Sequence, residues 1–117
     1  MRALTRCLAL LASALLAAQT PSAEPPTTVV IVRHAEKADD RDPDSPLSDA
    51  GRARARALVP QLAAFAPQAL VVSQRRRTAE TLAPLAAHLQ LPPLVRDNGQ
   101  VPELAAELLR SFRGKTV

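Results

Sequence analysis

The sequence predicts an α/β fold in which a parallel-type sheet carries helices on both faces, in three layers. Residues 27–32 and 69–73 are apolar and β-branched without alternation, which is typical of strands buried on both faces. The segments after them repeat apolar residues at helical spacing. Strands that alternate with helices in this way form a parallel sheet, because each helix carries the chain back across the sheet.

The first 23 residues have the composition of a secretory signal peptide. Arg2 and Arg6 form a basic start, residues 7–18 are almost entirely apolar, and the segment closes on small residues at Ala23. Cleavage there would leave a linker at 24–26 and a domain at 27–117. The apolar run is short for a bilayer span, so we expect a periplasmic or secreted protein without membrane attachment after cleavage. A buried N-terminal helix is the alternative.

Composition narrows the possible functions. Loss of Arg2 and Arg6 with the leader would lower the formal charge of +4 by two, leaving a mild positive charge that suits anionic substrates. The single cysteine lies in the leader, so the mature domain has no disulfide and no thiolate metal site. Phe65 and Phe112 are the only aromatic residues, which argues against single-stranded nucleic acid as a partner because stacking platforms are absent.

The first half of the domain contains one strand, one polar loop and one helix. The strand 27–32 leads into Arg33 and His34, and the loop 38–46 is rich in aspartate. Ser48 is a good N-cap for the helix that follows. Pro60 should kink or shorten this helix. The apolar positions expected to face the core are Ala50, Ala53, Ala57, Leu58, Leu62 and Phe65.

The second half repeats the alternation. After the strand 69–73, a second helix is interrupted by Pro84, where we expect a kink. A short strand at 94–96 precedes a third helix with Pro102 in its first turn, and Gly114 should end that helix. Residues 115–117 look like the opening of a fourth strand.

Because strands average five or six residues, we expect the domain to be incomplete, with its last strand or strands and helix missing. The apolar positions expected on the two helices are Ala79, Leu82, Leu85, Ala86 and Leu89, then Leu104, Leu108, Leu109 and Phe112.

Arg33 and His34 form the first candidate site. Open α/β sheets bind ligands at the carboxyl ends of their strands. A guanidinium beside an imidazole suits a phosphate group, since neutral imidazole has a free nitrogen lone pair near pH 7. A solvated strand end is the alternative.

Three motifs occur in order. Residues 33–37 read Arg-His-Ala-Glu-Lys, residues 47–51 read Leu-Ser-Asp-Ala-Gly, and residues 73–81 begin with serine and carry Arg77 at the fourth position after it. Together these motifs resemble the histidine phosphatase superfamily, the phosphoglycerate-mutase-like or RHG-type phosphatases, over residues 27–117. Ala35 replaces the glycine of many members, as in a subgroup of small phosphatases with an Arg-His-Ala-Glu-Lys motif.

The resemblance implies a metal-independent phosphatase, without a cofactor, that hydrolyses phosphomonoesters or phosphohistidine. His34 would attack the phosphorus and form phosphohistidine, while Arg33 and Arg77 clamp the equatorial oxygens. The partner would be a small phosphorylated substrate or a phosphoprotein. The sequence carries no signal for an oligomeric state.

The resemblance also implies an acid that protonates the leaving oxygen. Asp97 is the first candidate and Glu103 the second; Glu36 is a third, unless it pairs with Lys37. The family has a further histidine in the strand that should begin at Lys115, beyond the end of this sequence. A catalytically impaired phosphate-binding remnant that lacks this histidine is therefore the alternative function.

Other polar residues have simpler interpretations. Arg75 to Arg77 could form a nucleic-acid patch, but a short basic run without aromatic residues is usually solvated, and we expect no nucleic-acid partner. A set of possible metal ligands lies near the start of the loop: His34, Glu36, Asp39 and Asp40. Because Arg33 would repel a cation there, we expect no metal. Ser73 and Thr78 should shape the turn into the second helix, and His88 should lie on its surface.

Overall fold

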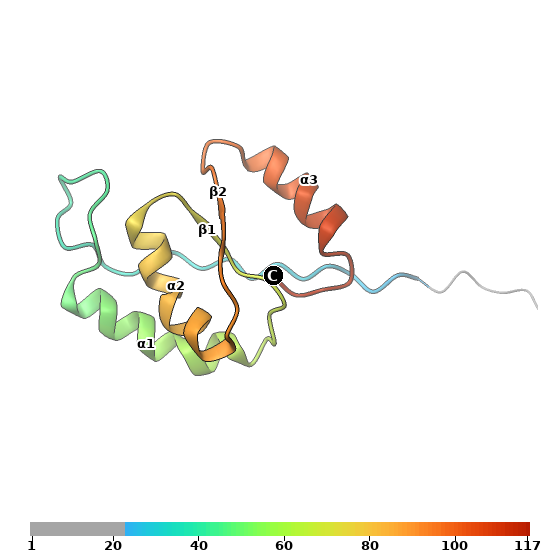
Figure 1. Cartoon of the computed structure of the whole chain (residues 1–117), viewed down its shortest axis with the longest axis horizontal. Coiled ribbons are helices and arrows are strands. Elements are labelled where there is room, and N and C mark those ends of the chain that lie inside the picture. Colours follow the sequence, from blue (N-terminus) through green and yellow to red (C-terminus); the bar gives the residue numbers. More distant parts are fainter. Residues whose placement is uncertain (1–22) are drawn as a thin grey trace, which may run out of the picture.

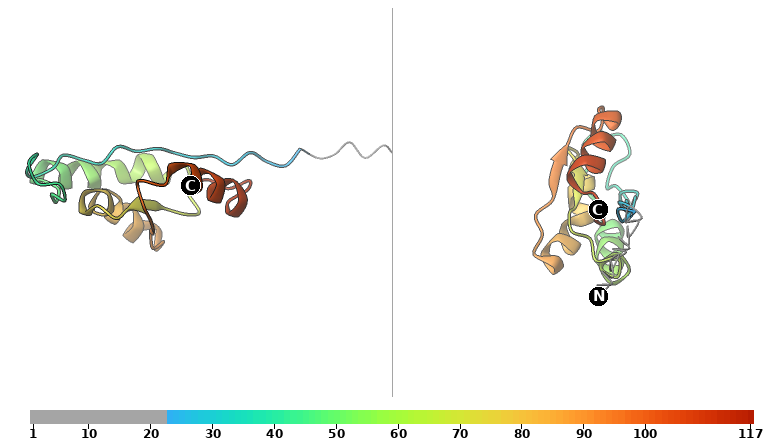
Figure 2. Two further views of the ribbon diagram at one scale, coloured as in Figure 1. Left: turned by 90° about the horizontal axis from the view of Figure 1, so that it is seen from above. Right: turned by 90° about the vertical axis from the view of Figure 1, so that its right-hand side faces the viewer.

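The computed structural model describes residues 23–117 (Figure 1). The expected signal peptide therefore lies outside the described residues, except for Ala23. The elements follow in the order α1 (Asp49–Ala63), β1 (Val71–Ser73), α2 (Arg76–Leu89), β2 (Leu94–Arg96) and α3 (Val101–Ser111). The first described residues run as an extended ribbon along one side of the molecule (Figure 2).

The sheet is parallel, as expected. β1 pairs with β2 in a register that places Val71 opposite Leu94 and Ser73 opposite Arg96. Helix α2 connects the two strands and packs on both β1 and α1. The carboxyl ends of both strands consequently lie at one edge of the sheet. The α/β class is confirmed.

Two more extended segments continue the parallel arrangement beyond β1. The N–H groups of Thr28 and Val30 donate to the carbonyls of Lys115 and Val117 at 2.9 and 2.8 Å, forming a parallel bridge between Thr28 and Thr116. On its other side, Thr116 accepts from the N–H of Gln68 at 2.8 Å. Residues 115–117 thus lie between the Thr28 segment and the chain that enters β1, where the fourth strand was expected.

The first expected strand differs from the prediction. Residues 27–32 are extended but form no regular strand, and Val29 and Ile31 are 45% and 90% exposed instead of buried. The pairing with residues 115–117 reaches only as far as Val30. A strand is buried on both faces only where other elements pack on both faces of its sheet. Residues 27–32 therefore keep an extended backbone while the side chains of Val29 and Ile31 stay exposed.

Helix α1 begins where Ser48 caps it. The Ser48 hydroxyl oxygen accepts from the N–H of Gly51 at 3.0 Å. The buried positions of this helix are Gly51 and Ala55, whereas the expected Ala53 and Ala57 are exposed. The predicted face was wrong because Gly51 and Ala55, four residues apart, form the face that packs on the chain at Ala35 and Glu36, whereas Ala53 and Ala57 lie on other faces of the helix. Ala55 joins Ala35 and Leu47 in the buried core cluster.

The prolines inside the helices do not end them. α1 continues from Pro60 to Ala63, and α2 continues from Pro84 to Leu89. The expected shortening at Pro60 is therefore slight, and the kink at Pro84 stays a prediction. α2 ends with Gln90 in the left-handed conformation, a common stop for a helix.

Helix α3 is attached to β2 by an ion pair. The Arg96 guanidinium donates from Nε and Nη2 to the two carboxylate oxygens of Glu107, at 2.8 and 2.5 Å. Two parallel bonds of this kind fix geometry as well as charge. Of the expected apolar positions, Leu108 is buried and Leu109 is 62% exposed. Within residues 23–117, no helix has the length and hydropathy needed to cross a bilayer.

Replacing Gly51 with alanine should destabilise the fold. A Cβ there would lie 2.3 Å from the backbone oxygen of Glu36, and backbone atoms cannot move aside cheaply. We expect the free energy of unfolding to fall by about 1–3 kcal/mol, measured by urea denaturation. Gly99→Ala is the matched control, because its Cβ would meet only a side-chain oxygen at 3.3 Å. Equal stability of both variants would contradict this packing argument.

The Arg96–Glu107 pair should make stability depend on pH. The hydrogen bond from Arg96 holds the pKa of Glu107 below its ordinary value of 4.5. A lowered folded-state pKa stabilises the fold above the unfolded value, and the contribution is lost as pH falls through the folded pKa. We therefore expect Glu107→Gln to lower the Tm at neutral pH and to approach the wild-type Tm in acid. Glu103→Gln on the same helix is the control, and a constant difference across pH would contradict the linkage.

Candidate active site

His34 follows the extended segment 27–32 and is half-buried. Its Nδ1 lies 2.8 Å from the backbone oxygen of Ala35. A carbonyl oxygen can only accept, so this hydrogen bond requires a proton on Nδ1. In the neutral ring, Nε2 then carries the free lone pair. The local backbone therefore selects the nitrogen that is available for attack.

Ala35 also connects His34 to helix α2. Its N–H donates to the hydroxyl oxygen of Thr81 at 2.9 Å, and that hydroxyl lies 2.7 Å from the backbone oxygen of Arg77. Ala35 and Thr81 are 3% and 4% exposed, so little water reaches these bonds. The segment after His34 and the first turn of α2 are therefore directly attached to each other.

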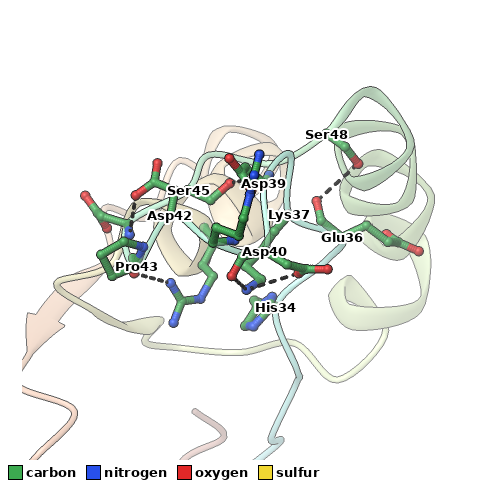
Figure 3. Close-up of polar contacts among 12 residues, drawn as sticks. His34, Glu36, Lys37, Asp39, Asp40, Asp42, Pro43, Ser45 and Ser48 are labelled. Atoms are coloured by element: carbon green, nitrogen blue, oxygen red, sulfur yellow. Dashed lines mark hydrogen bonds and ion pairs between the residues drawn. The ribbon is translucent and has the colours of Figure 1, made fainter.

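The loop after His34 is held by both α1 and α2. The carbonyl of Glu36 accepts from the N–H and the hydroxyl of Ser48 at 2.9 and 3.2 Å (Figure 3). The N–H of Leu47 donates to the Glu80 carboxylate at 2.8 Å. Within the loop, Ser45 accepts from the N–H of Asp39 at 2.9 Å. These bonds fix the return of the chain from His34 to the start of α1.

Arg77 lies in the first turn of α2 and is half-buried. Its Nη1 donates to the carbonyl of Pro43 at 2.9 Å, whereas its Nε is buried and has no hydrogen-bond partner among the described residues. A buried donor without a partner costs free energy, so an unpaired guanidinium nitrogen requires an explanation. Arg33, the other predicted clamp, is exposed.

The loop also caps the start of α2. Arg75, the N-cap residue, makes no side-chain capping bond; instead Asp44 accepts from the N–H of Arg76 at 2.9 Å. A carboxylate at this position satisfies a free donor and complements the helix dipole. Asp44 thereby ties the loop to the helix turn that bears Arg77.

The candidate acids lie in different places. Asp97 follows β2, and its Oδ1 accepts from the N–H of Gly99 at 2.8 Å and lies 3.4 Å from Nε2 of Gln74. Gln74 follows β1, so Asp97 is at the same edge of the sheet as the end of β1. Glu103 is exposed in the first turn of α3.

Glu36 does not pair with Lys37 as proposed from the sequence. It accepts from Nε of Arg54 on α1 at 2.6 Å, while Lys37 pairs with Asp40 at 3.2 Å. The prediction was wrong because adjacent side chains diverge, whereas α1 brings Arg54 alongside. The hydrogen bond from Arg54 lowers the pKa of Glu36, which makes this carboxyl a poor proton donor.

A cavity of about 580 Å³ lies beside His34. Its polar side is formed by His34, Ser73, Thr78 and Thr81. Apolar residues from the extended segment before His34, from β1, from α2 and from α3 form most of the rest, among them Ile31 and Leu108. Neither Asp97 nor Glu103 lines it. The structure thus gathers His34 with Thr78 and Thr81 of α2 at this cavity. Both predicted clamps, Arg33 and Arg77, and both candidate acids lie outside its lining.

Two smaller predictions are confirmed. The hydroxyls of Ser73 and Thr78 are 2.9 Å apart, and Thr78 also donates to the backbone of this turn, so both residues shape the entry into α2. His88 is exposed. In the described part of the chain, no three His, Cys, Asp or Glu residues cluster as metal ligands would.

The sequence did not reveal the residues that hold Arg77 and the loop. Asp44, Glu80 and the carbonyl of Pro43 all act across more than thirty positions of the sequence. Thr81 could have been found, because the third motif contains it at the fourth position after Arg77. A loop aspartate that contacts a residue far away in the sequence, as Asp44 contacts Arg76, is not marked by any regular spacing between the two residues.

Comparison with known proteins gives the family. The model of the histidine phosphatase superfamily (branch 1) matches residues 29–99, more than half of the chain. The chain therefore belongs to this superfamily. The expected phosphoglycerate-mutase-like α/β fold is confirmed by solved structures of the same family.

Among these structures, a putative phosphohistidine phosphatase SixA from Nakamurella multipartitia is 29% identical with a TM-score of 0.54, over 77% of this chain and 56% of that one. The mycobacterial glucosyl-3-phosphoglycerate phosphatase is 24% identical with a TM-score of 0.50, over 60% of this chain and 34% of that one. A structure described as mycobacterial hydrolase 1 has the same identity and TM-score. The chain thus spans between one third and just over half the length of these proteins.

The cap on α2 can be tested by stability. Asp44→Ala removes the acceptor for the Arg76 N–H, and we expect the free energy of unfolding to fall by about 1 kcal/mol. Asp44→Asn keeps an acceptor and should retain most of the stability. Asp40→Ala is the control, since this exposed carboxylate pairs only with Lys37 among the described residues. An Asp44→Ala protein as stable as the Asp40→Ala protein would show that the bond does not cap the helix.

Proposed function

We propose that this protein is a metal-independent phosphatase that hydrolyses phosphomonoesters or phosphohistidine through a phosphohistidine at His34. Membership of the histidine phosphatase superfamily supports the class of reaction. The observation that carries the residue assignment is the hydrogen bond between Nδ1 of His34 and the Ala35 carbonyl, which leaves Nε2 as the nucleophile.

The reaction has two steps. In the first, Nε2 attacks phosphorus, a P–N bond forms, the P–O or P–N bond to the leaving group breaks, and an acid protonates the leaving atom. In the second, water attacks the phosphorus of phosphohistidine, a P–O bond forms, and the proton of the water goes to the conjugate base of the acid. The P–N bond breaks with its electron pair returning to Nε2, and inorganic phosphate is released. Nδ1–H stays on the Ala35 carbonyl in both steps, so the imidazolium charge that develops is stabilised by a fixed dipole.

The arginines act on the transferring group. Phosphoryl transfer spreads negative charge over three equatorial oxygens, which guanidinium groups bind bidentately. Arg77 supports this role because the Pro43 carbonyl accepts from its Nη1 and so orients the guanidinium at the first turn of α2. Arg33 is the second clamp, on the residue before the nucleophile. Two guanidiniums supply the charge that a metal provides in other phosphoryl-transfer sites, so no cofactor is needed.

The proton donor is proposed to be Asp97, with Glu103 as the second candidate. Asp97 lies at the sheet edge that β1 and β2 share, close to Gln74 and Gly99. Glu36 is the weakest candidate, since its pairing with Arg54 keeps it ionised.

The proposed substrates are small phosphorylated molecules or phosphoproteins. The similarity to the SixA structure, at 29% identity, favours phosphohistidine as one of them. The basic and apolar leader supports a periplasmic or secreted location, without membrane attachment after cleavage. The scarcity of aromatic residues supports the absence of a nucleic-acid partner.

Substitution of His34 tests the proposal. His34→Ala should lower kcat/KM for p-nitrophenyl phosphate by at least about a thousandfold, and EDTA should leave the wild-type rate unchanged. Incubation with a labelled substrate should give an acid-labile, alkali-stable phosphoprotein in wild type alone. His88→Ala is the matched control, because His88 is exposed on α2.

Three outcomes would contradict the proposal. Loss of the activity in EDTA would show a metal-dependent reaction, and an unchanged rate in His34→Ala would remove the nucleophile. Stabilisation by millimolar phosphate without any turnover would favour the phosphate-binding remnant instead.

A further inference from the structure

Thr81 is hydrogen-bonded both to the chain next to His34 and to the backbone of Arg77, the proposed nucleophile and one of the proposed phosphate clamps. It lies in the second turn of α2, is 4% exposed, and shares its hydroxyl between Ala35, beside the nucleophile, and Arg77, on its own helix. Both contacts are short, at 2.9 and 2.7 Å. It also lines the cavity beside His34.

The directions of these bonds are determined by chemistry. A hydroxyl has one proton, and the Arg77 carbonyl can only accept, so Thr81 donates to Arg77. The N–H of Ala35 can only donate, so Thr81 accepts from it. The carbonyl of Ala35 then accepts from Nδ1 of His34. Hydrogen bonds on the two sides of Ala35, joined through its Cα, therefore link the backbone of Arg77 to the imidazole ring.

We propose that Thr81 is a positioning residue that fixes the orientation and tautomer of His34 relative to Arg77. The N–H that Thr81 binds belongs to the peptide unit joining His34 to Ala35, so this bond fixes the backbone from which the imidazole projects. With that backbone fixed, the Ala35 carbonyl stays on Nδ1 and the lone pair stays on Nε2. The inference rests on the proposed function for its catalytic meaning, although the geometry stands without it.

An ordinary helical threonine would account for only one of the two hydrogen bonds of Thr81, the one to the Arg77 carbonyl. Threonine hydroxyls in helices often bond the carbonyl four residues earlier, as Thr81 does with Arg77. The bond from Ala35 is different, since it joins residues 46 positions apart. Ala35 is almost completely buried, so without Thr81 its N–H would lose a partner that water cannot readily replace.

The test uses a valine and a serine variant of the full chain. Thr81→Val keeps the shape and removes the hydroxyl, whereas Thr81→Ser keeps the hydroxyl and removes a methyl group. In wild type, ¹⁵N NMR should show the neutral His34 ring protonated on Nδ1, and the Ala35 amide should exchange slowly with solvent. In Thr81→Val we expect a mixture of tautomers and amide exchange at least about tenfold faster. Thr81→Ser should restore both signals.

Thr78→Val is the matched control, because it removes a hydroxyl from the same helix that bonds only the turn of residues 73–75. It should leave the tautomer of His34 and the Ala35 exchange rate as in wild type. Circular dichroism establishes that each variant is folded. If Thr81→Val does not fold, Thr81→Ala, which also removes the hydroxyl, takes its place with the same expected result.

Several results would overturn the inference. A wild-type His34 protonated on Nε2, or a rapidly exchanging Ala35 amide, would do so without any variant. A folded Thr81→Val protein with wild-type tautomer and exchange would do so as well, as would a serine variant that behaves like valine. None of these readings requires turnover, so an inactive wild-type protein with the expected spectra would refute the proposed function and leave the role of Thr81 intact.

Discussion

The close approach of two backbones at Glu36 is the constraint on which the site depends. The carbonyl of Glu36 accepts two hydrogen bonds from Ser48, and Gly51 presents no side chain at this contact. Any side chain on α1 here would push the helix away from the segment that bears His34. The same serine caps α1, so the start of the helix and the position of the loop are set by one residue.

Helix α2 supplies the other half of the site. Thr81 and Glu80 both reach back to the chain between His34 and α1, and Asp44 reaches forward to the first turn of α2. Side chains of α2 therefore bind the backbone between His34 and α1, and a side chain of that segment binds the backbone of α2. The cost of the arrangement is an unpaired Nε on Arg77, held in place by a loop carbonyl. Unsatisfied buried donors are rare in folded proteins.

Much of the fold was predictable, because it depends on local patterns. The positions of β1, β2 and the three helices follow from apolar runs and from turn residues, and the Ser48 cap follows from residue type alone. The burial of residues 27–32 was not predictable, since it depends on the neighbours that a strand finds and not on its own composition. The core face of α1 was missed for a related reason: Gly51 and Ala55 are buried by close packing rather than by hydrophobicity.

The site shows the same division. His34 and Arg77 were evident from motifs, while the contacts that hold them required the tertiary structure, as the pairing of Glu36 with Arg54 illustrates. Adjacent charges in a sequence suggest partners that the backbone then separates. Residues that position others leave a sequence signal only where helical spacing constrains them, as it does between Arg77 and Thr81.

The bridge between Thr28 and Thr116 has a consequence for the order of folding. It closes a loop of nearly the whole described chain, and contacts of such separation form slowly because the entropy of loop closure must be overcome first. During synthesis, residues 115–117 leave the ribosome long after the segment they pair with. The α1, α2 and β1–β2 unit can therefore assemble early, whereas the segment that carries His34 receives this strand partner only after residues 115–117 have been synthesised.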